Sequence, residues 1–318
     1  MKKVLVASLL SSILFSAGLK AEVLISDRFS ADPSAHKFGD TYYVYATNDQ
    51  DNSGEYWDST DWRLFSSKDL RNWKDEGSFL HNSVFKWADK DAKAWAPGAF
   101  ERNGKYYFYA PVGGNQIGVA VSDNPKGPYI DPINKPLVEK PRDKNVGAEP
   151  IDPAIFVDTD GQAYMYFGTR VPKVVPLGED MISLDGEITD VTVNGYPADD
   201  KKKKYGEAPF LHMHEGKYYF TFSTGWPGQI VYATGDSPLG PFEYQGVIID
   251  YLKISTNHHS ILQDGDKNYI FYHDKVKENG GSHKRSILVA ELEYGDNGQI
   301  IQLDLKHRQL KYRPQINR

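Results

Sequence analysis

Five near-copies of one short pattern constrain what this 318-residue chain can fold into. Each copy is a glycine-containing turn followed by an aromatic strand whose faces alternate. The copies read "FGDTYYVYAT", "NGKYYFYAP", "DGQAYMYFGT", "EGKYYFTFS" and "DGDKNYIFYH". Their tyrosines recur every 50 to 64 residues, which is the period of a propeller blade of about four strands. These tyrosines are Tyr42, Tyr106, Tyr164, Tyr218 and Tyr269.

A further strand pattern follows four of the five copies, in "RLFSSKDLRNW", "IGVAVSDNPKGPY", "IVYATGDSPLGPF" and "SILVAELEY". Helical periodicity is almost absent after the N-terminal segment. The sequence therefore predicts an all-β chain, a single five-bladed β-propeller within residues 22–318, and the alternative is two unrelated β-domains. The stretch from about Lys173 to Lys204, which ends in "DDKKKK", breaks the rhythm. We expect a solvated loop there that could reach the rim of a site.

The N-terminus has the pattern of a secretory signal peptide. Lys2 and Lys3 precede an apolar run over residues 4–18 that is short for a membrane span, and Ala21 is a plausible cleavage position. We expect residues 1–21 to be removed and the protein to be exported to the periplasm or the medium, a membrane anchor being the alternative. Cleavage would remove three lysines and no acid, so the net charge becomes −6 − 3 = −9.

Composition narrows the partners. The net charge of −6 comes without a basic stripe, which argues against nucleic acid. The chain has no cysteine, so neither a disulfide nor a lipid-bearing cysteine is available. Aromatic residues make up 13% of the chain, which suits both β-sheets and stacking on sugar rings. We expect a monomer with no membrane partner after signal cleavage.

A short segment lies roughly ten residues ahead of each recurring tyrosine. The segments are "ADPSA" with Asp32, "WAPGA" with Trp95, "IDPAI" with Asp152, "GEAPF" with Glu207 and "NHHSI" with His258. Equivalent positions in five blades would meet at one end of the central channel. Two carboxyl groups that face one another are what glycoside hydrolysis requires, one as proton donor and one to attack the sugar or activate water. A third can tune the proton donor.

At these residues the sequence resembles glycoside hydrolase family 43, a group of inverting enzymes on a five-bladed propeller. The resemblance implies that Asp32 is the general base that activates water. It implies that Glu207 is the general acid and that Asp152 raises the pKa of that acid and orients it. In the inverting geometry the carboxyl groups of Asp32 and Glu207 are expected to lie about 6.5–9.5 Å apart.

The resemblance extends to other positions. His258 matches a histidine that lies near the channel axis and often meets a calcium ion or its waters, although Asn257 replaces the family's glycine. Arg285 in "HKRSILVAELEY" matches an arginine that reaches the substrate. Trp95 is a candidate wall of the sugar pocket. We therefore expect Trp95, His258 and Arg285 to bind substrate, and calcium as a possible ion at His258, with no organic cofactor.

The family acts chiefly on α-L-arabinofuranosides and β-D-xylosides of plant cell walls. The amino-acid sequences of the repeats, and the lack of a β-sandwich domain in this sequence, favour an exo-acting α-L-arabinofuranosidase that removes arabinose from arabinoxylan or arabinan. An exo-β-1,4-xylosidase is the close alternative. A propeller that binds carbohydrate without cutting it is the alternative from another class, and the three filled acidic positions argue against it.

Overall fold

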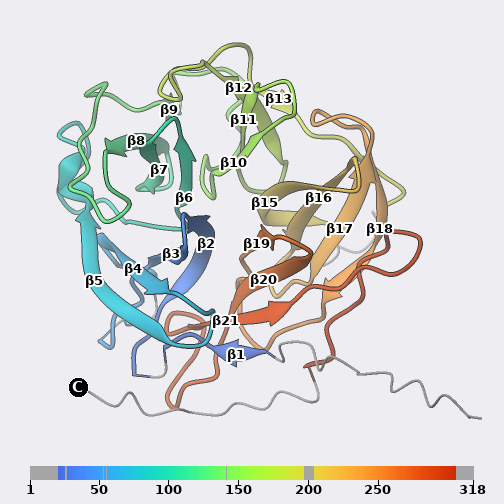
Figure 1. The fold of residues 1–318 in the computed structure, drawn as a ribbon. Coiled ribbons are helices and arrows are strands. Elements are labelled where there is room, and N and C mark those ends of the chain that lie inside the picture. Colours follow the sequence, from blue (N-terminus) through green and yellow to red (C-terminus); the bar gives the residue numbers. More distant parts are fainter. Residues whose placement is uncertain are drawn as a thin grey trace, which may run out of the picture.

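The computed structural model describes residues 21–25, 27–52, 54, 56–140, 142–196 and 204–305. Within these ranges the chain is built from strands, and its one helical element is a short 3-10 helix, η1 (Asn82–Val84). The strands form five sheets arranged as a ring (Figure 1), which confirms the predicted five-bladed β-propeller. None of the described residues belongs to a helix long and apolar enough to cross a membrane.

Each blade is one sheet of four strands, and blade 4 carries a fifth strand at its outer edge. From the axis outward, the first three blades are β2 (Ala31–Phe38), β3 (Thr41–Thr47), β4 (Asp61–Ser67) and β5 (Trp73–His81); β6 (Gly98–Arg102), β7 (Lys105–Val112), β8 (Gln116–Ser122) and β9 (Val138–Glu139); and β10 (Ala154–Val157), β11 (Ala163–Phe167), β12 (Lys173–Leu177) and β13 (Thr189–Asp190). The last two are β15 (Tyr205–His214), β16 (Lys217–Thr224), β17 (Ile230–Gly235), β18 (Phe242–Ile249) and β14 (Val193–Asn194); and β19 (His259–Asp264), β20 (Lys267–Asp274), β21 (Ser286–Glu291) and β1 (Glu22–Val23).

The ring is closed by the N-terminal strand. β1 pairs antiparallel with β21, with Glu22 opposite Val289 and Val23 opposite Leu288. Blade 5 therefore combines the first described strand with three strands from the C-terminal part of the chain. The innermost strands also contact one another in ring order, from β2 through β6, β10 and β15 to β19 and back to β2.

The recurring tyrosines lie in the second strand of each blade: β3, β7, β11, β16 and β20. Both faces of these strands are buried, because alternate side chains pack against the two neighbouring blades. In β3, Val44 packs toward blade 5 and Tyr45 toward blade 2. Five hydrophobic clusters fill the five spaces between blades. Each fully buried large side chain stabilises the ring by about 1.5–3 kcal/mol.

The expected solvated insert is wrong over the first part of its range. β12 begins at Lys173 and pairs with β11 along its whole length, and Val174 and Val175 are fully buried. The strand was hidden in the sequence because Pro176, opposite Tyr164, interrupts a run of only five residues. Residues 197–203, which include most of "DDKKKK", lie outside the described residues, as do residues 1–20 of the expected signal peptide.

Candidate active site

Asp32 and Asp152 lie where the innermost strands of blades 1 and 3 begin. Both have left-handed backbone, with φ of 54° and 57°, and each precedes a proline. In blade 1 the pairing of β2 with β3 shifts between Ala31 and Ser34, so Asp32 lies in a β-bulge. Aspartate is one of the residues that tolerates this conformation, and bulges commonly re-aim side chains beside active sites. The Asp-Pro repeat therefore turns a carboxylate toward the axis.

Glu207 reaches the same place by a different route. In "GEAPF" the residue before the proline is Ala208, and Ala208 adopts the left-handed backbone, with φ of 56°. In this conformation the backbone N–H of Ala208 donates a 2.9 Å hydrogen bond to Oδ2 of Asp152. Such strained backbone typically persists where the surrounding structure uses it. The pairing of β15 with β16 is irregular around Glu207, which marks a β-bulge. The hydrogen bond from Ala208 connects blade 4 to blade 3, and the Glu207 side chain, one residue earlier, extends into the site.

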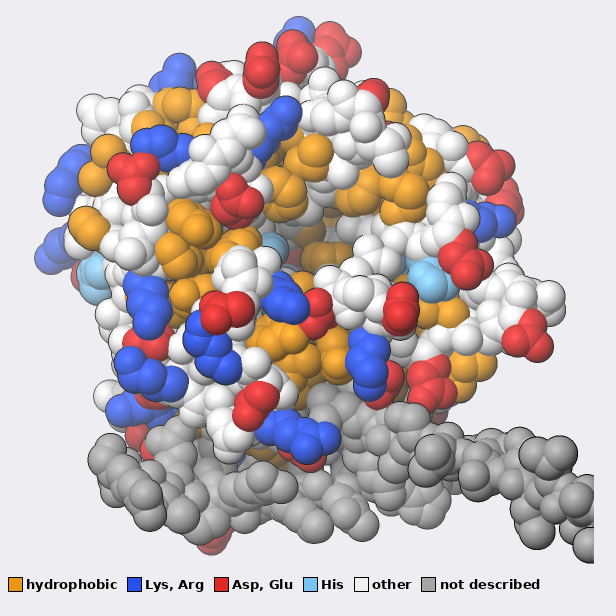
Figure 2. All heavy atoms as spheres, viewed as in Figure 1, with side chains coloured by type: hydrophobic (Ala, Val, Ile, Leu, Met, Phe, Trp, Pro, Cys, Tyr) orange, Lys and Arg blue, Asp and Glu red, His pale blue; other side chains and the backbone are white. Residues whose placement is uncertain are grey.

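A cavity of about 240 Å³ opens at this end of the axis. Figure 2 shows the opposite face of the ring, where the surface is hollowed at the other end of the axis. All six residues singled out in the sequence line the cavity of about 240 Å³: Asp32, Trp95, Asp152, Glu207, His258 and Arg285. The carboxylates lie deep, with Asp32, Asp152 and Glu207 exposed by 7%, 5% and 9%. Aromatic side chains form one wall. Trp95 donates its indole N–H to the carbonyl of Trp57 at 3.0 Å, and Tyr56 packs against both rings.

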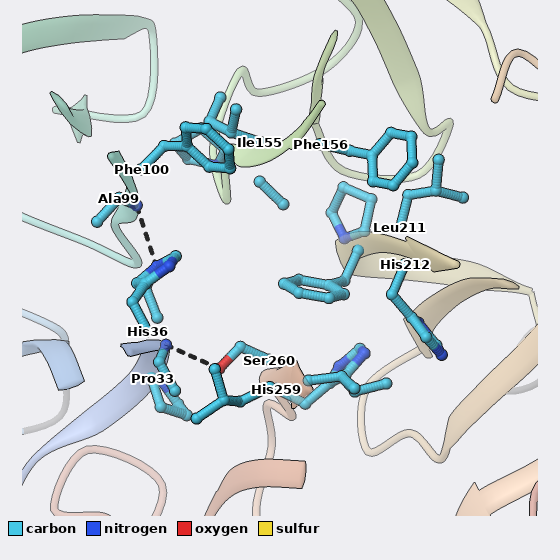
Figure 3. A pocket seen from close by; sticks show the side chains of 18 of the residues that line it. Pro33, His36, Ala99, Phe100, Ile155, Phe156, Leu211, His212, His259 and Ser260 are labelled. Atoms are coloured by element: carbon cyan, nitrogen blue, oxygen red, sulfur yellow. Dashed lines mark hydrogen bonds between the residues drawn. The ribbon is translucent and has the colours of Figure 1, made fainter. Parts of the chain in front are cut away.

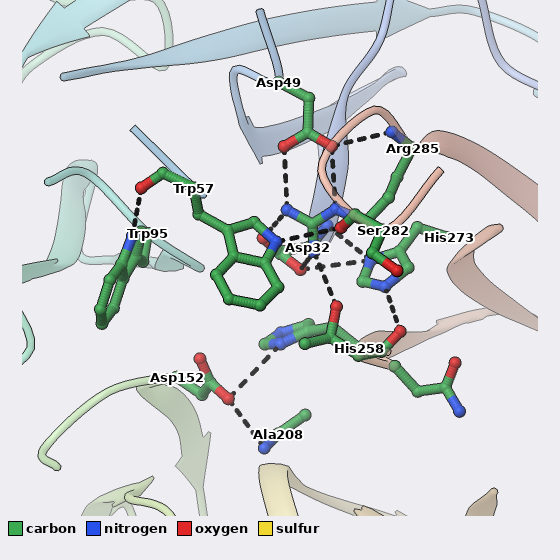
Figure 4. A network of polar contacts seen from close by, with 12 residues as sticks. Asp32, Asp49, Trp57, Trp95, Asp152, Ala208, His258, His273, Ser282 and Arg285 are labelled. Atoms are coloured by element: carbon green, nitrogen blue, oxygen red, sulfur yellow. Dashed lines mark hydrogen bonds and ion pairs between the residues drawn. The ribbon is translucent and has the colours of Figure 1, made fainter. Parts of the chain in front are cut away.

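Asp32 is held by a dense set of donors (Figure 4). Arg285 donates to both carboxylate oxygens, Nη1 to Oδ1 at 2.9 Å and Nη2 to Oδ2 at 3.1 Å. The backbone N–H of Asp32 donates to Nδ1 of His273 at 3.1 Å. Nε2 of His273 lies 3.0 Å from the carbonyl of Thr256, and its Nδ1 lies 3.2 Å from Oδ1 of Asp32. The backbone and the side chain of Asp32 are both fixed.

Asp49 holds Arg285 from the other side. Its carboxylate accepts from Nε at 2.8 Å, from Nη2 at 2.9 Å and from the backbone N–H of Arg285 at 2.8 Å. The guanidinium is only 2% exposed and lies between two carboxylates. Paired charges of this kind satisfy a buried arginine that would otherwise be costly. The contacts of Arg285 are therefore with Asp32 and Asp49 first, and its predicted contact with substrate stays a prediction.

The three carboxyl groups differ in protonation. Burial favours the neutral form of Asp32, but the charge of Arg285 and the contact with His273 outweigh burial and hold its pKa far below the usual range. Burial raises the pKa of Glu207 to about 8. Trp226 lowers this pKa, and the charge of Asp32 raises it. Burial and the charge of Glu207 raise the pKa of Asp152 as well. Asp32 is thus ionised at neutral pH, whereas the protonated forms of Glu207 and Asp152 are favoured.

His258 lies at the floor of the cavity, with Nδ1 3.8 Å from Oδ2 of Asp152, and burial lowers its pKa to about 4. Among the described residues no group of three or more His, Cys, Asp or Glu side chains is arranged to hold a metal. Calcium usually takes six to eight oxygen ligands, which these side chains do not assemble. The expected calcium ion at His258 stays a prediction, and we derive no chemical step through it.

The axis continues below His258 as a second cavity of about 350 Å³ (Figure 3). Inner strands line it with apolar side chains such as Phe100, Ile155 and Phe210, and with His36, whose pKa burial lowers to about 4. No carboxyl group of the described residues lines this cavity. The acidic groups are therefore gathered at one end of the channel, as the spacing of the sequence segments predicted.

Sequence reasoning missed several residues of the site. Asp49, Arg170 and Trp226 each lie two or three residues past the end of a second strand, beyond β3, β11 and β16. Antiparallel pairing brings these strand ends beside the starts of the innermost strands, so the residues after each recurring strand were a usable signal. Glu149 and His273 also went unnoticed. Glu149 is a fourth carboxylate in the cavity and accepts from Oγ1 of Thr169 at 3.3 Å.

Comparison with known proteins agrees with this geometry. The family model described as glycosyl hydrolases family 43 matches residues 23–300. A xylosidase/arabinosidase from Bacteroides ovatus is 34% identical over 89% of this chain and 97% of its own length. The structure of a family 43 enzyme from Xanthomonas citri superposes with a TM-score of 0.80 at 34% identity, covering 93% of this chain and 97% of that one.

An α-L-arabinofuranosidase from Clostridium thermocellum is also similar in structure, with a TM-score of 0.73 at 34% identity over 88% of this chain and 95% of that one. The family match spans nearly all the described residues, and the relatives match over nearly their whole length. The predicted resemblance is therefore confirmed. The chain belongs to glycoside hydrolase family 43.

Proposed function

We propose that this glycosidase is an inverting, exo-acting enzyme that removes α-L-arabinofuranosyl residues from plant cell-wall polysaccharides such as arabinoxylan or arabinan. One observation carries the proposal. Asp32 is paired with Arg285, whereas Asp152 and Glu207 form no ion pair with Lys or Arg in the described part of the chain. Carboxyl groups whose surroundings push their pKa values apart serve as base and acid.

In this mechanism Asp32 accepts a proton from a water molecule as the water attacks the anomeric carbon. The bond from that carbon to the glycosidic oxygen breaks on the opposite face, and Glu207 gives its proton to the departing oxygen. Atoms and charge balance, because one water is consumed, Asp32 ends the step protonated and Glu207 ends it ionised. Proton exchange with solvent then restores the starting state of both groups. Room for that water requires the two carboxyl groups to lie about 6.5–9.5 Å apart.

Asp152 acts through Glu207. Its carboxyl group is buried and oriented by the N–H of Ala208, the residue next to Glu207. Burial raises the pKa of both carboxyl groups, and like charges so close disfavour each other's ionisation, which keeps a proton available to the leaving group near neutral pH. The role expected for Asp152 from the family resemblance is therefore part of the proposal.

The size of the cavity favours removal of single sugar units. Its volume of about 240 Å³ lies below the ~300–1,000 Å³ typical of sites for drug-sized ligands, so it suits one pentose ring. The relatives' names include both xylosidase and arabinosidase, and the exo-β-1,4-xylosidase remains the second candidate. We also propose that residues 1–21 direct export, which brings the enzyme to extracellular polysaccharide.

The test is sugar release from p-nitrophenyl α-L-arabinofuranoside, p-nitrophenyl β-D-xyloside, arabinoxylan and arabinan. We expect arabinose from the first substrate and from at least one polymer, and no release by an Asp32→Ala variant. Xylose release without arabinose would make the protein a xylosidase. Affinity for the polymers without any release would instead favour a carbohydrate-binding propeller.

A further inference from the structure

Trp226 and Arg170 form a pair at the mouth of the cavity. The guanidinium of Arg170 lies over the indole ring of Trp226, 5.5 Å from its centroid. Both residues line the cavity, yet the Trp226 side chain is 40% exposed and Arg170 is exposed as well. Exposed indole surface at the rim of a deep polar pocket offers an apolar face to a ligand that extends out of that pocket.

The backbone holds Arg170 in this position. Its φ is 67°, a left-handed conformation that is uncommon for arginine, and its N–H donates to the carbonyl of Gly206 at 2.8 Å. Gly206 immediately precedes Glu207. The loop between β11 and β12 is therefore fastened to the strand that carries the proposed acid. Among the described residues Arg170 makes no ion pair within 4.0 Å, which leaves its guanidinium donors available.

Trp226 also lies beside the acid. Both side chains line the cavity, and the Trp226 side chain lowers the pKa of Glu207 by favouring its ionised form. The proposed acid gives its proton to the glycosidic oxygen, so the departing sugar must lie beside Glu207. Asp32 and Arg285 lie deeper, at 7% and 2% exposure. The buried carboxyl groups of Asp32 and Glu207 therefore lie deeper in the cavity than Trp226 and Arg170.

We infer that Trp226 and Arg170 form the subsite for the leaving group, and that it binds the neutral sugar unit of the polysaccharide from which the pentose is cut. This inference rests on the proposed function and explains how the enzyme would recognise the polymer. The indole face packs on the C–H face of the sugar ring, and the guanidinium donates to its hydroxyl groups. Arg170 touches the leaving group and not the reacting atoms, so it determines specificity without taking part in the chemistry.

The test compares two substrates with the same pentose and different leaving groups. One is a pentosyl fluoride, whose small leaving group cannot reach the rim, and the other is an oligosaccharide with the pentose on a xylosyl unit. Arg170→Asn is the main variant, because asparagine tolerates the left-handed backbone. Arg170→Lys keeps the charge and loses the planar fork. Arg71→Asn, in the exposed turn between β4 and β5, is the matched control.

We expect Arg170→Asn to lower kcat/KM on the oligosaccharide about ten-fold or more, the loss typical of a charged hydrogen bond. The same variant should stay within about two-fold of wild type on the fluoride, Arg170→Lys should recover part of the loss, and Arg71→Asn should change neither. Equal losses on both substrates, or no loss on the oligosaccharide, would overturn the subsite while wild-type turnover still supports the proposed function. A wild type inactive on both substrates would overturn the proposed function and this inference together.

Discussion

Arg285 donates two hydrogen bonds of 2.9 and 3.1 Å to the carboxylate of Asp32, although the two residues are separated by 253 positions in the chain. Blade 5 thereby reaches across to blade 1 and fixes the ionisation of the proposed base. Bidentate pairs of this kind combine charge with orientation, and lysine cannot reproduce both. Asp49 accepts hydrogen bonds from the other side of the same guanidinium. Residues of blade 1 and blade 5 therefore together hold the proposed base.

The charge of Arg285 predicts a shift in the acid limb of the pH profile. Without that charge the pKa of Asp32 rises, because burial then dominates. An Arg285→Gln variant should therefore lose activity at a higher pH on acidification than wild type, and Arg285→Lys should shift less. The measurement is kcat/KM against pH on an activated aryl pentoside.

Thermal unfolding is the companion measurement for the Arg285 variants. Arg285→Gln leaves two buried carboxylates without their cation, which typically costs about 3–5 kcal/mol, so we expect a clear fall in Tm. Arg285→Lys should fall less. Identical acid limbs in all three proteins would contradict the role assigned to Arg285.

Asp32→Asn should abolish turnover while leaving the fold and the sugar site in place. The amide keeps the shape of the side chain but cannot accept a proton from water, and loss of such a base typically lowers rate about 10²–10⁴-fold. Turnover should be followed with an aryl pentoside, and binding of the free pentose by calorimetry. Substantial residual turnover at unchanged pH dependence would show that another group activates the water.

Glu207→Ala should discriminate between leaving groups. A poor leaving group such as a sugar needs protonation as it departs, whereas a nitrophenolate needs little. The variant should therefore lose far more activity on oligosaccharides than on activated aryl pentosides. Equal losses on both would mean that Glu207 is not the acid.

Trp226→Phe should move the basic limb of the profile upward. Activity requires the protonated form of Glu207, so in wild type it falls as the pH rises through about 8. The indole N–H stabilises the ionised form and lowers this pKa, and its removal should carry the fall in activity to higher pH. A basic limb that stays in place or moves down would contradict the contact between Trp226 and Glu207.

Glu207→Gln should stabilise the protein above pH 5. In the unfolded chain the glutamate loses its proton near pH 4.5, whereas in the folded protein it holds the proton up to about pH 8. Between these values the folded state binds more protons, so wild-type stability falls as pH rises, and it stays low above pH 8. Glutamine has no such loss. The Tm difference between the variant and wild type should grow from pH 5 to 8, and a constant difference would contradict the raised pKa.

Much of the fold could be predicted from the sequence because each blade carries its own local signal. The glycine turn before Tyr42 and its counterparts marks the hairpin between the first two strands, and the Asp-Pro segment marks the bulge at Asp32. β12 was missed because Pro176 interrupts its alternation. Local pattern fails where a proline or a very short strand removes the period on which the prediction depends.

The partners of the acidic groups were harder to predict. Asp49 and His273 meet Asp32 or Arg285 only after the ring closes, across 236 and 241 positions of sequence. The only signal in "YATNDQ" is that Asp49 follows a recurring strand, and His273 lies within the recurring strand β20. The site residues found from sequence lie in the segments ahead of the recurring strands, whereas these two lie at or just past the ends of such strands.

The most direct test of the account follows hydrolysis of an aryl α-L-arabinofuranoside by proton NMR from the first turnovers. Wild type and Asp32→Asn are run side by side, with an aryl β-D-xyloside as the second substrate. The account predicts that wild type releases arabinose whose first-formed anomer is inverted relative to the substrate, and that the variant releases none. Release of the retained anomer, or undiminished release by Asp32→Asn, would contradict it.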